Sequence, residues 1–115
     1  MTETIELTAE SIPEGEALQL TQAGLQLDQA RASGDKAQLA AALEHNMQLW
    51  IAIRTLVTSA GSKVPENLQG NLTRLANFVA QTTMKHGVDS PDNVIDTLVN
   101  INLQISEGLL EGHKS

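Results

Sequence analysis

The sequence predicts an all-α fold, a small antiparallel bundle of four helices, and three observations carry this prediction. Apolar residues recur every three or four positions in three segments of the chain, which is the period of a helix that buries one face. Capping residues, glycines and prolines stand at the ends of these segments. No segment shows the alternation of apolar and polar residues that is typical of a β-strand. With 115 residues, of which 41% are apolar, the chain is long enough for one domain with a single core.

The first helix has the weakest pattern. Residues 1–10 are polar and acidic, and we expect them to form a flexible arm ahead of a single helical domain that spans residues 11–115. Ser11, with Glu14 three residues later, is expected to cap a helix that runs to about Ser33. The apolar residues of this helix lie on two sides, with Leu18, Leu25 and Ala32 on one and Leu20, Ala23 and Leu27 on the other. Because this stripe is diffuse, we expect the helix to dock weakly and to be able to move.

The second helix is expected from Lys36 to about Ala60. Gly34 suits the C-cap of the preceding helix, and Asp35 suits the N-cap of the new one. Trp50 is the only tryptophan of the chain and lies on the apolar stripe, so it is expected to anchor the core. The stripe comprises Leu39, Leu43, Trp50, Ile53 and Val57.

The third and fourth helices carry the clearest stripes. Pro65 suits the first turn of the third helix, and Gly87 suits its end. Ser90 and Pro91 are expected as the N-cap and the first residue of the fourth helix, which ends near Gly112. The stripes comprise Leu68, Leu72, Leu75 and Val79, flanked by Ala76 and Phe78, in the third helix and Val94, Leu98, Ile101, Ile105 and Leu109 in the fourth.

The links between the last three helices are short. Helices joined by short links turn back on each other, so we expect these three to form one compact antiparallel unit. Trp50 and Phe78 are expected to anchor its core. The other core residues expected there are Leu72, Leu75, Val79, Leu98, Ile101 and Ile105.

Two asparagines interrupt the apolar stripes. Asn46 lies on the stripe of the second helix and Asn102 on that of the fourth. A buried amide without hydrogen-bond partners costs about 1–3 kcal/mol, so we expect both side chains to be buried and hydrogen-bonded. Their expected role is structural, to fix the register where helices meet. The alternative is a direct contact with a partner protein.

Composition and spacing exclude several function classes. His45, His86 and His113 lie on different segments with no metal-ligand spacing, and the chain has no glycine-rich phosphate loop and no paired acids on a shared apolar face. We therefore expect no enzyme, no metal and no cofactor. A net charge of −7 argues against direct nucleic-acid binding. There is no apolar run of roughly 18 residues to span a membrane, no basic signal peptide and no cysteine, so a cytoplasmic location is expected.

A partner-binding surface is therefore the expected functional feature. With one tryptophan, one phenylalanine and no tyrosine, this surface should be aliphatic, and we assign Met47, Ile51 and Met84 to it together with the first helix. Arg54 and Arg74 are isolated cations on an acidic protein, and we assign them to the same surface. For each, a specific salt bridge and a solvated charge are equally compatible with the sequence.

An ordered series of residues between Leu39 and Leu110 resembles a known family. The series comprises Asn46, Leu49-Trp50, Pro65-Glu66-Asn67-Leu68, Leu72, Leu75, Phe78-Val79, Leu98, Ile101-Asn102, Ile105 and Gly108-Leu109. At these spacings it resembles the FlaF family of bacterial flagellar proteins, which are short, helical and cytoplasmic. The resemblance implies a factor needed for flagellin production and export that acts on flagellin as a secretion chaperone. It also implies FlbT, a regulator of flagellin messenger RNA, as a second partner.

Two other interpretations remain open at this point. One is a post-transcriptional regulator of flagellin expression that acts with FlbT, and the other is an unrelated helical adaptor protein. An exposed apolar groove between helices would favour the chaperone. A localised basic stripe would favour direct action on the message, and complete burial of all apolar stripes would favour the adaptor.

Overall fold

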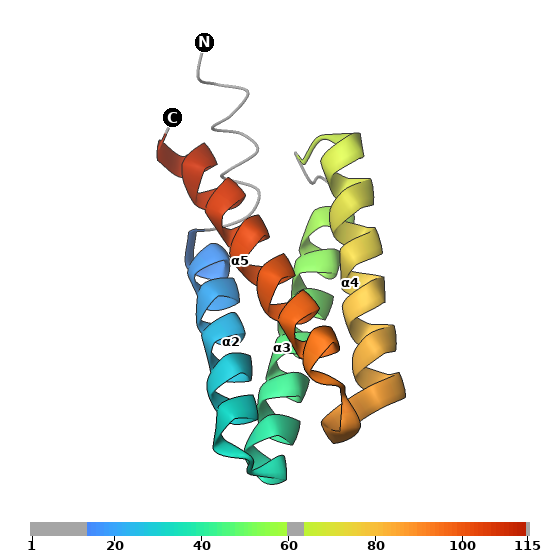
Figure 1. Ribbon diagram of the computed structural model, residues 1–115. Coiled ribbons are helices and arrows are strands. Elements are labelled where there is room, and N and C mark those ends of the chain that lie inside the picture. The colour runs from blue at the N-terminus through green and yellow to red at the C-terminus, as the bar shows by residue number, and fades with distance from the viewer. Residues whose placement is uncertain (1–13, 60–63, 115) are drawn as a thin grey trace.

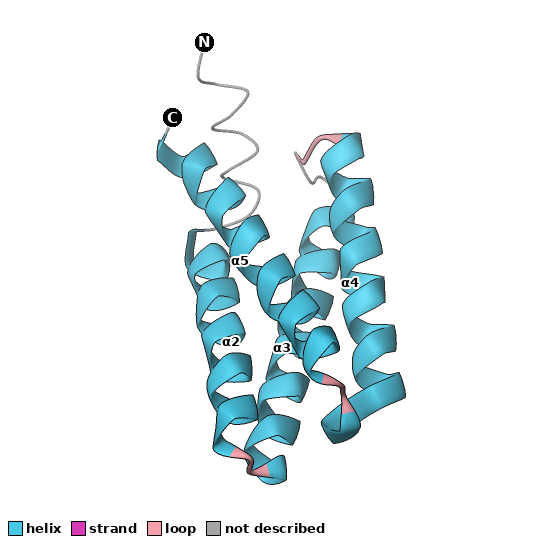
Figure 2. Ribbon diagram, in the orientation of Figure 1, coloured by secondary structure: helices cyan, strands magenta, loops and turns pink. Residues whose placement is uncertain are grey.

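The chain folds into an antiparallel bundle of helices (Figures 1 and 2). The computed structural model describes residues 14–59 and 64–114, which contain no strand. The described helices are α2 (Glu14–Ser33), α3 (Lys36–Thr58), α4 (Glu66–His86) and α5 (Asp92–Lys114), and the 3-10 turn η1 (Gly87–Asp89) precedes α5. The all-α prediction is confirmed. The expected arm, the cap at Ser11 and the expected end of the second helix at Ala60 lie outside the described residues.

Local residues explain where the helices begin and end. Asp35 Oδ1 accepts hydrogen bonds from the backbone N–H groups of Ala37 at 2.9 Å and Gln38 at 3.4 Å, which caps α3. Gly34 and Gly87 have φ values of 72° and 52°, a conformation that favours glycine and stops a helix. Ser90 is not the N-cap of α5, because α5 begins at Asp92 and the Pro91 carbonyl accepts its first backbone hydrogen bonds. The hydroxyl and the backbone N–H of Ser90 both donate to the Gly87 carbonyl, at 2.7 and 3.1 Å, and so close η1.

The order of packing differs from the expected one. α5 packs along α2, α2 also packs along α3, and α3 packs along α4. The expectation that the last three helices form one compact unit is therefore wrong, because α5 crosses to α2 and moves away from α4 towards its C-terminus (Figure 1). Small residues permit this approach, since a Cβ at Gly24 would lie 3.4 Å from the Cβ of Asn102.

The helix α2 is firmly docked, which corrects the expectation of a weakly docked first helix. Its buried residues are Ala17, Leu20, Ala23, Leu27 and Ala30, and Leu18 and Leu25 face solvent. Ser106 Oγ donates to the Ala17 carbonyl at 2.6 Å, so the Thr21 hydroxyl must donate to Ser106 Oγ at 2.6 Å. The diffuse stripe arises because alanines allow close packing but add little hydrophobic signal.

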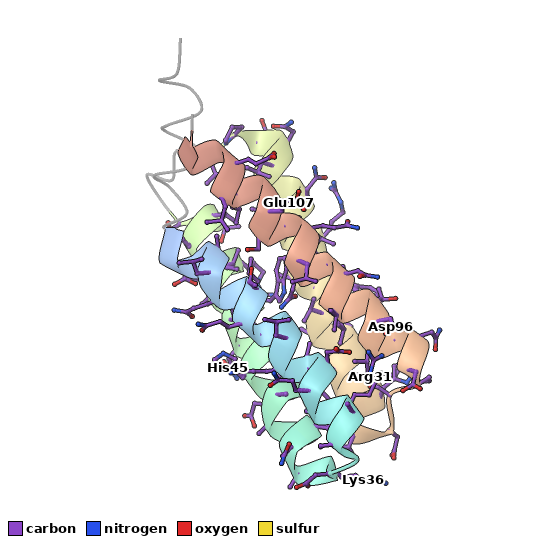
Figure 3. The ribbon with its side chains drawn as sticks, turned by 60° about the vertical axis from the view of Figure 1, so that its left-hand side comes forward. Arg31, Lys36, His45, Asp96 and Glu107 are labelled. Atoms are coloured by element: carbon purple, nitrogen blue, oxygen red, sulfur yellow. The ribbon has the colours of Figure 1, made fainter. Side chains whose placement is uncertain are left out.

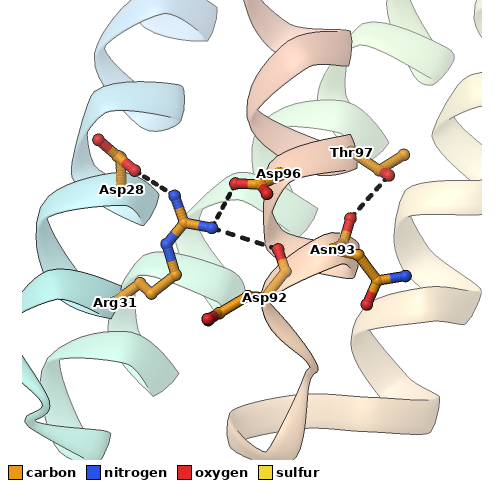
Figure 4. Close-up of polar contacts among 6 residues, drawn as sticks. All are labelled: Asp28, Arg31, Asp92, Asn93, Asp96 and Thr97. Atoms are coloured by element: carbon orange, nitrogen blue, oxygen red, sulfur yellow. Dashed lines mark hydrogen bonds and ion pairs between the residues drawn. The ribbon is translucent and has the colours of Figure 1, made fainter.

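An ion-pair cluster connects the C-terminal end of α2 to the N-terminal end of α5 (Figure 4). The guanidinium of Arg31 pairs with Asp28 on its own helix and with Asp96 on α5, and it also donates to the Asp92 carbonyl at 3.2 Å. The hydrogen bond to Asp96, and to a smaller extent the one to Asp28, raises the pKa of Arg31 above its ordinary value. Since the side chains of Asp28 and Asp96 are more than half exposed, the cluster orients the helices more than it stabilises the fold.

A buried polar network joins α2, α3 and α5 at the centre of the core. Trp50, Asn46 and Asn102 are all fully buried. Trp50 Nε1 donates to Asn102 Oδ1 at 2.9 Å, and Asn102 Nδ2 donates to the Leu20 carbonyl at 3.1 Å and to Asn46 Oδ1 at 2.6 Å. Asn102 thus fixes the register of three helices through one side chain. Among the described residues, Asn46 Nδ2 finds no hydrogen-bond partner.

The expectation that Phe78 anchors the core is wrong, because its side chain is 43% exposed. The buried side of α4 is formed by Leu72, Ala76, Val79 and Thr83. A residue next to Val79 in the sequence is turned about 100° around the helix, which carries Phe78 onto the surface. Leu75, Ile101 and Ile105, also expected in the core, are only partly buried at its edge.

Gly108 offers a test of the packing around α5. It lies inside the helix, and a Cβ built on it would meet nothing within 4 Å. Because glycine in a helix costs roughly 0.5–1 kcal/mol relative to alanine, Gly108→Ala should raise the free energy of unfolding by about that amount in urea denaturation. Gly34→Ala is the control and should destabilise, since φ is 72° there. A destabilising Gly108→Ala would contradict the open surroundings.

Candidate partner-binding surface

The bundle is open between α4 and α5. In the packing order α5, α2, α3, α4, these two helices occupy the ends, and they are not a closely packed pair although only η1 and two residues join them. A hollow of about 360 Å³ lies between them. It is lined by Phe78, Gln81, Thr82, Lys85 and His86 of α4 and by Val94 and Thr97 of α5.

The apolar lining continues beyond this hollow. Leu75 precedes Phe78 by three residues, and Ile101 follows Thr97 by four, so each lies on the same side of its helix as the residues that line the hollow. Leu75, Val94 and Ile101 are half-buried and keep part of their apolar surface exposed. We call the strip formed by Leu75, Phe78, Val94 and Ile101 the α4–α5 seam.

The five residues assigned to partner binding from the sequence all lie on α3 and α4. Arg54 Nη1 donates to Asn77 Oδ1 at 2.6 Å, which sets the register of this antiparallel pair. Met47 precedes Arg54 by seven residues, and Met84 follows Asn77 by seven residues, which is about two turns in each case. Because α3 and α4 are antiparallel, the two methionines lie at the same height along the helix pair. Met84 is 73% exposed, and Met47 and Ile51 are half-buried.

Arg74 belongs to a different line on α4. It is exposed and donates to Asn71 Oδ1 on the preceding turn. Arg74, Phe78, Gln81 and Lys85 are spaced at i, i+4, i+7 and i+11, so they follow one exposed line of about 16 Å along the helix. We call this line the α4 outer stripe. It borders the α4–α5 seam, and the two share Phe78.

The surface position of Phe78 differs from the expectation, and Val94 and Ile101 were not expected at a surface. A helical wheel of α4 could have found Phe78, because it lies well away from the line through Leu72, Ala76 and Val79. No sequence signal could have found the other two. They lie on the apolar stripe of α5, and only the packing of α5 on α2 leaves them beside an open seam.

Two other hollows lie among the described residues. One lies between α2 and α3 and is lined mainly by amides and alanines together with His45 (Figure 3). Another lies between α2 and α5, where Glu107 and Glu111 form part of the wall. The described residues contain no group of three or more potential metal ligands, and none of the described helices is both long and apolar enough to cross a membrane. Of these three hollows, only the one between α4 and α5 includes an exposed phenyl ring, that of Phe78, so the α4 side is the candidate for apolar recognition.

The fold and this surface define a small all-α bundle with one open, partly apolar seam. The chain belongs to the FlaF family, because the family model described as flagellar protein FlaF matches residues 3–109. That is a family of flagellar proteins and not a family of enzymes. Comparison with curated proteins and with solved structures found no match in either set.

Proposed function

We propose that this protein binds flagellin at the α4–α5 seam and acts as a chaperone-like factor in flagellin synthesis and export in the cytoplasm. Membership of the FlaF family supports a role in the flagellum. The open seam with its exposed apolar side chains is the single observation that supports the mode of binding. FlbT is the expected second partner, and the same binding assay tests it.

The seam suits the apolar face of a helix. A helix that lies in a groove presents apolar side chains at i, i+3 or i+4, and i+7, and the seam offers apolar groups at matching intervals on α4 and α5. Phe78 is 43% exposed, and its half-buried neighbours Leu75, Val94 and Ile101 would lose further apolar surface to water on binding. Such burial supplies roughly 25 cal/mol for each Å² removed from water.

Calorimetry with purified flagellin tests the proposal. Binding should show a negative heat-capacity change and only a modest dependence on salt, as apolar burial predicts. Phe78→Ala should weaken binding by about tenfold, because truncation of a central aromatic contact typically costs more than 1 kcal/mol. The melting temperature should change little, since this side chain is largely outside the core.

Leu18→Ala is the matched control. Leu18 is 48% exposed on α2, so Leu18→Ala also removes an exposed apolar side chain, but from a helix that contributes no residue to the hollow between α4 and α5. It should leave the affinity for flagellin within about twofold of the unaltered protein. Equal losses in the two variants would reject the seam as the binding site, and no binding to any flagellin of the host would reject the proposed function.

A further inference from the structure

The charges of this acidic chain are strongly segregated. Residues 45–88 contain one acidic residue, Glu66, and four cations, Arg54, Lys63, Arg74 and Lys85. The remainder of the chain contains 13 acidic residues and three cations. One continuous stretch thus carries a formal charge of +3 and the rest −10. In the fold, this stretch supplies most of α3 and all of α4.

The cations on the two sides of the bundle also differ in their partners. Arg31 pairs with Asp28 and Asp96, and Lys36 Nζ lies 3.7 Å from Asp89 Oδ1 (Figures 3 and 4). Within residues 14–59 and 64–114, no carboxylate pairs with Arg54, Arg74 or Lys85. Arg54 and Arg74 donate instead to neutral asparagine oxygens. The positive charge beside the α4 outer stripe is therefore not compensated by the described part of the protein.

These cations flank an exposed aromatic ring. Arg74 lies one turn before Phe78 and Lys85 two turns after it on the α4 outer stripe, and Arg54 contacts the same helix through Asn77. An apolar centre with cations at both ends complements a helix that has one apolar line bordered by carboxylates. A basic helix is disfavoured here, because Arg74 and Lys85 would repel its positively charged side chains.

We propose that the α4 outer stripe docks an acidic amphipathic helix of the partner, with Phe78 against its apolar line and Arg74 and Lys85 beside its carboxylates. This proposal rests on the proposed function in one respect only, namely that the partner is flagellin. A nucleic-acid ligand fits less well. Three cations can neutralise few phosphates against the acidic remainder of the chain, and Phe78 is the only exposed phenylalanine or tryptophan ring among the described residues for base stacking.

The test compares two double variants of equal charge. Arg74→Gln with Lys85→Gln removes two positive charges from the stripe, and Gln22→Glu with Gln29→Glu adds two negative charges to the exposed side of α2. The probes are purified flagellin, a synthetic helical peptide in which glutamates border a line of leucines, the same peptide with glutamine for every glutamate, and a single-stranded RNA oligonucleotide. Thermal unfolding of each variant checks that the fold is intact.

The glutamate peptide should bind the unaltered protein more tightly than the glutamine peptide. The stripe variant should bind both this peptide and flagellin about 3–10-fold more weakly than the unaltered protein at low salt. The α2 variant should change neither affinity by more than about twofold. Equal affinities of the stripe variant and the unaltered protein would overturn the inference, as would stripe-dependent binding of RNA tighter than that of the glutamate peptide.

The two proposals fail separately. If flagellin binds through Phe78 but is indifferent to Arg74 and Lys85, the acidic-helix inference falls and the proposed function stands. If the glutamate peptide binds in a stripe-dependent manner but flagellin does not bind, the inference stands and the partner is another protein with an acidic helix.

Discussion

Replacement of Trp50 by alanine is expected to lower the free energy of unfolding by about 3–5 kcal/mol. The ring is fully buried on α3 among the large core side chains, so its removal leaves a cavity that the surrounding helices can only partly close. The loss also leaves Asn102 Oδ1 without the indole donor that lies 2.9 Å away. Denaturation in urea or guanidinium, followed by circular dichroism, measures the change.

Trp50→Phe is the control that separates packing from hydrogen bonding. It keeps an aromatic ring in the core but removes the indole N–H, so it should cost about 1–3 kcal/mol. A denaturation curve of Trp50→Ala close to that of the unaltered protein would contradict the assignment of this ring to the core.

Asn102→Leu is expected to be nearly as damaging, with a loss of about 2–5 kcal/mol, although leucine is the more apolar residue. Asn102 makes hydrogen bonds to Trp50, to Asn46 and to the Leu20 carbonyl, and its replacement leaves the first two of these groups buried without that partner. The same denaturation experiment measures the effect.

Two further substitutions sharpen this prediction. Asn100→Leu, on the exposed side of the same helix, should stay within about 0.5 kcal/mol of the unaltered protein. Asn46→Leu should cost less than Asn102→Leu, because Asn46 makes one hydrogen bond in the network and its Nδ2 has no partner among the described residues. If Asn102→Leu were fully stable but no longer bound flagellin, Asn102 would act in recognition and not in the fold.

Local sequence signals predicted the helices well. Asp35 caps α3, and Gly34 and Gly87 adopt the positive φ expected at helix ends. These features depend on a few neighbouring residues, so they can be derived without knowledge of the tertiary structure. Ser90 is the exception. Its hydroxyl and its backbone N–H both donate to the Gly87 carbonyl and close η1, and the first backbone hydrogen bonds of α5 go to the carbonyl of Pro91 instead.

The candidate site was predictable only in part. Met47 and Met84 are expected on a partner surface because the chain has few aromatic residues, and Arg54 because it is an isolated cation on an acidic protein. The register of α3 and α4 brings these three residues along one helix pair. The α4–α5 seam could not be predicted, because it exists only where two neighbouring helices fail to pack. The segregation of charge was visible in the sequence, but its significance depends on which cations lack carboxylate partners in the fold.

The sequence by itself determined the helices, their approximate ends and the apolar side of α3, because helical period and capping are local properties. The tertiary structure alone decided which helix packs on which. An apolar stripe predicts that a face is buried but not which element covers it. Ala17, Ala23 and Gly24 permit a close α2–α5 contact, which their weak hydrophobic signal does not predict. Because α5 packs on α2 and not along α4, Val94 and Ile101 keep part of their apolar surface exposed beside the α4–α5 seam, although both lie on the apolar stripe of α5.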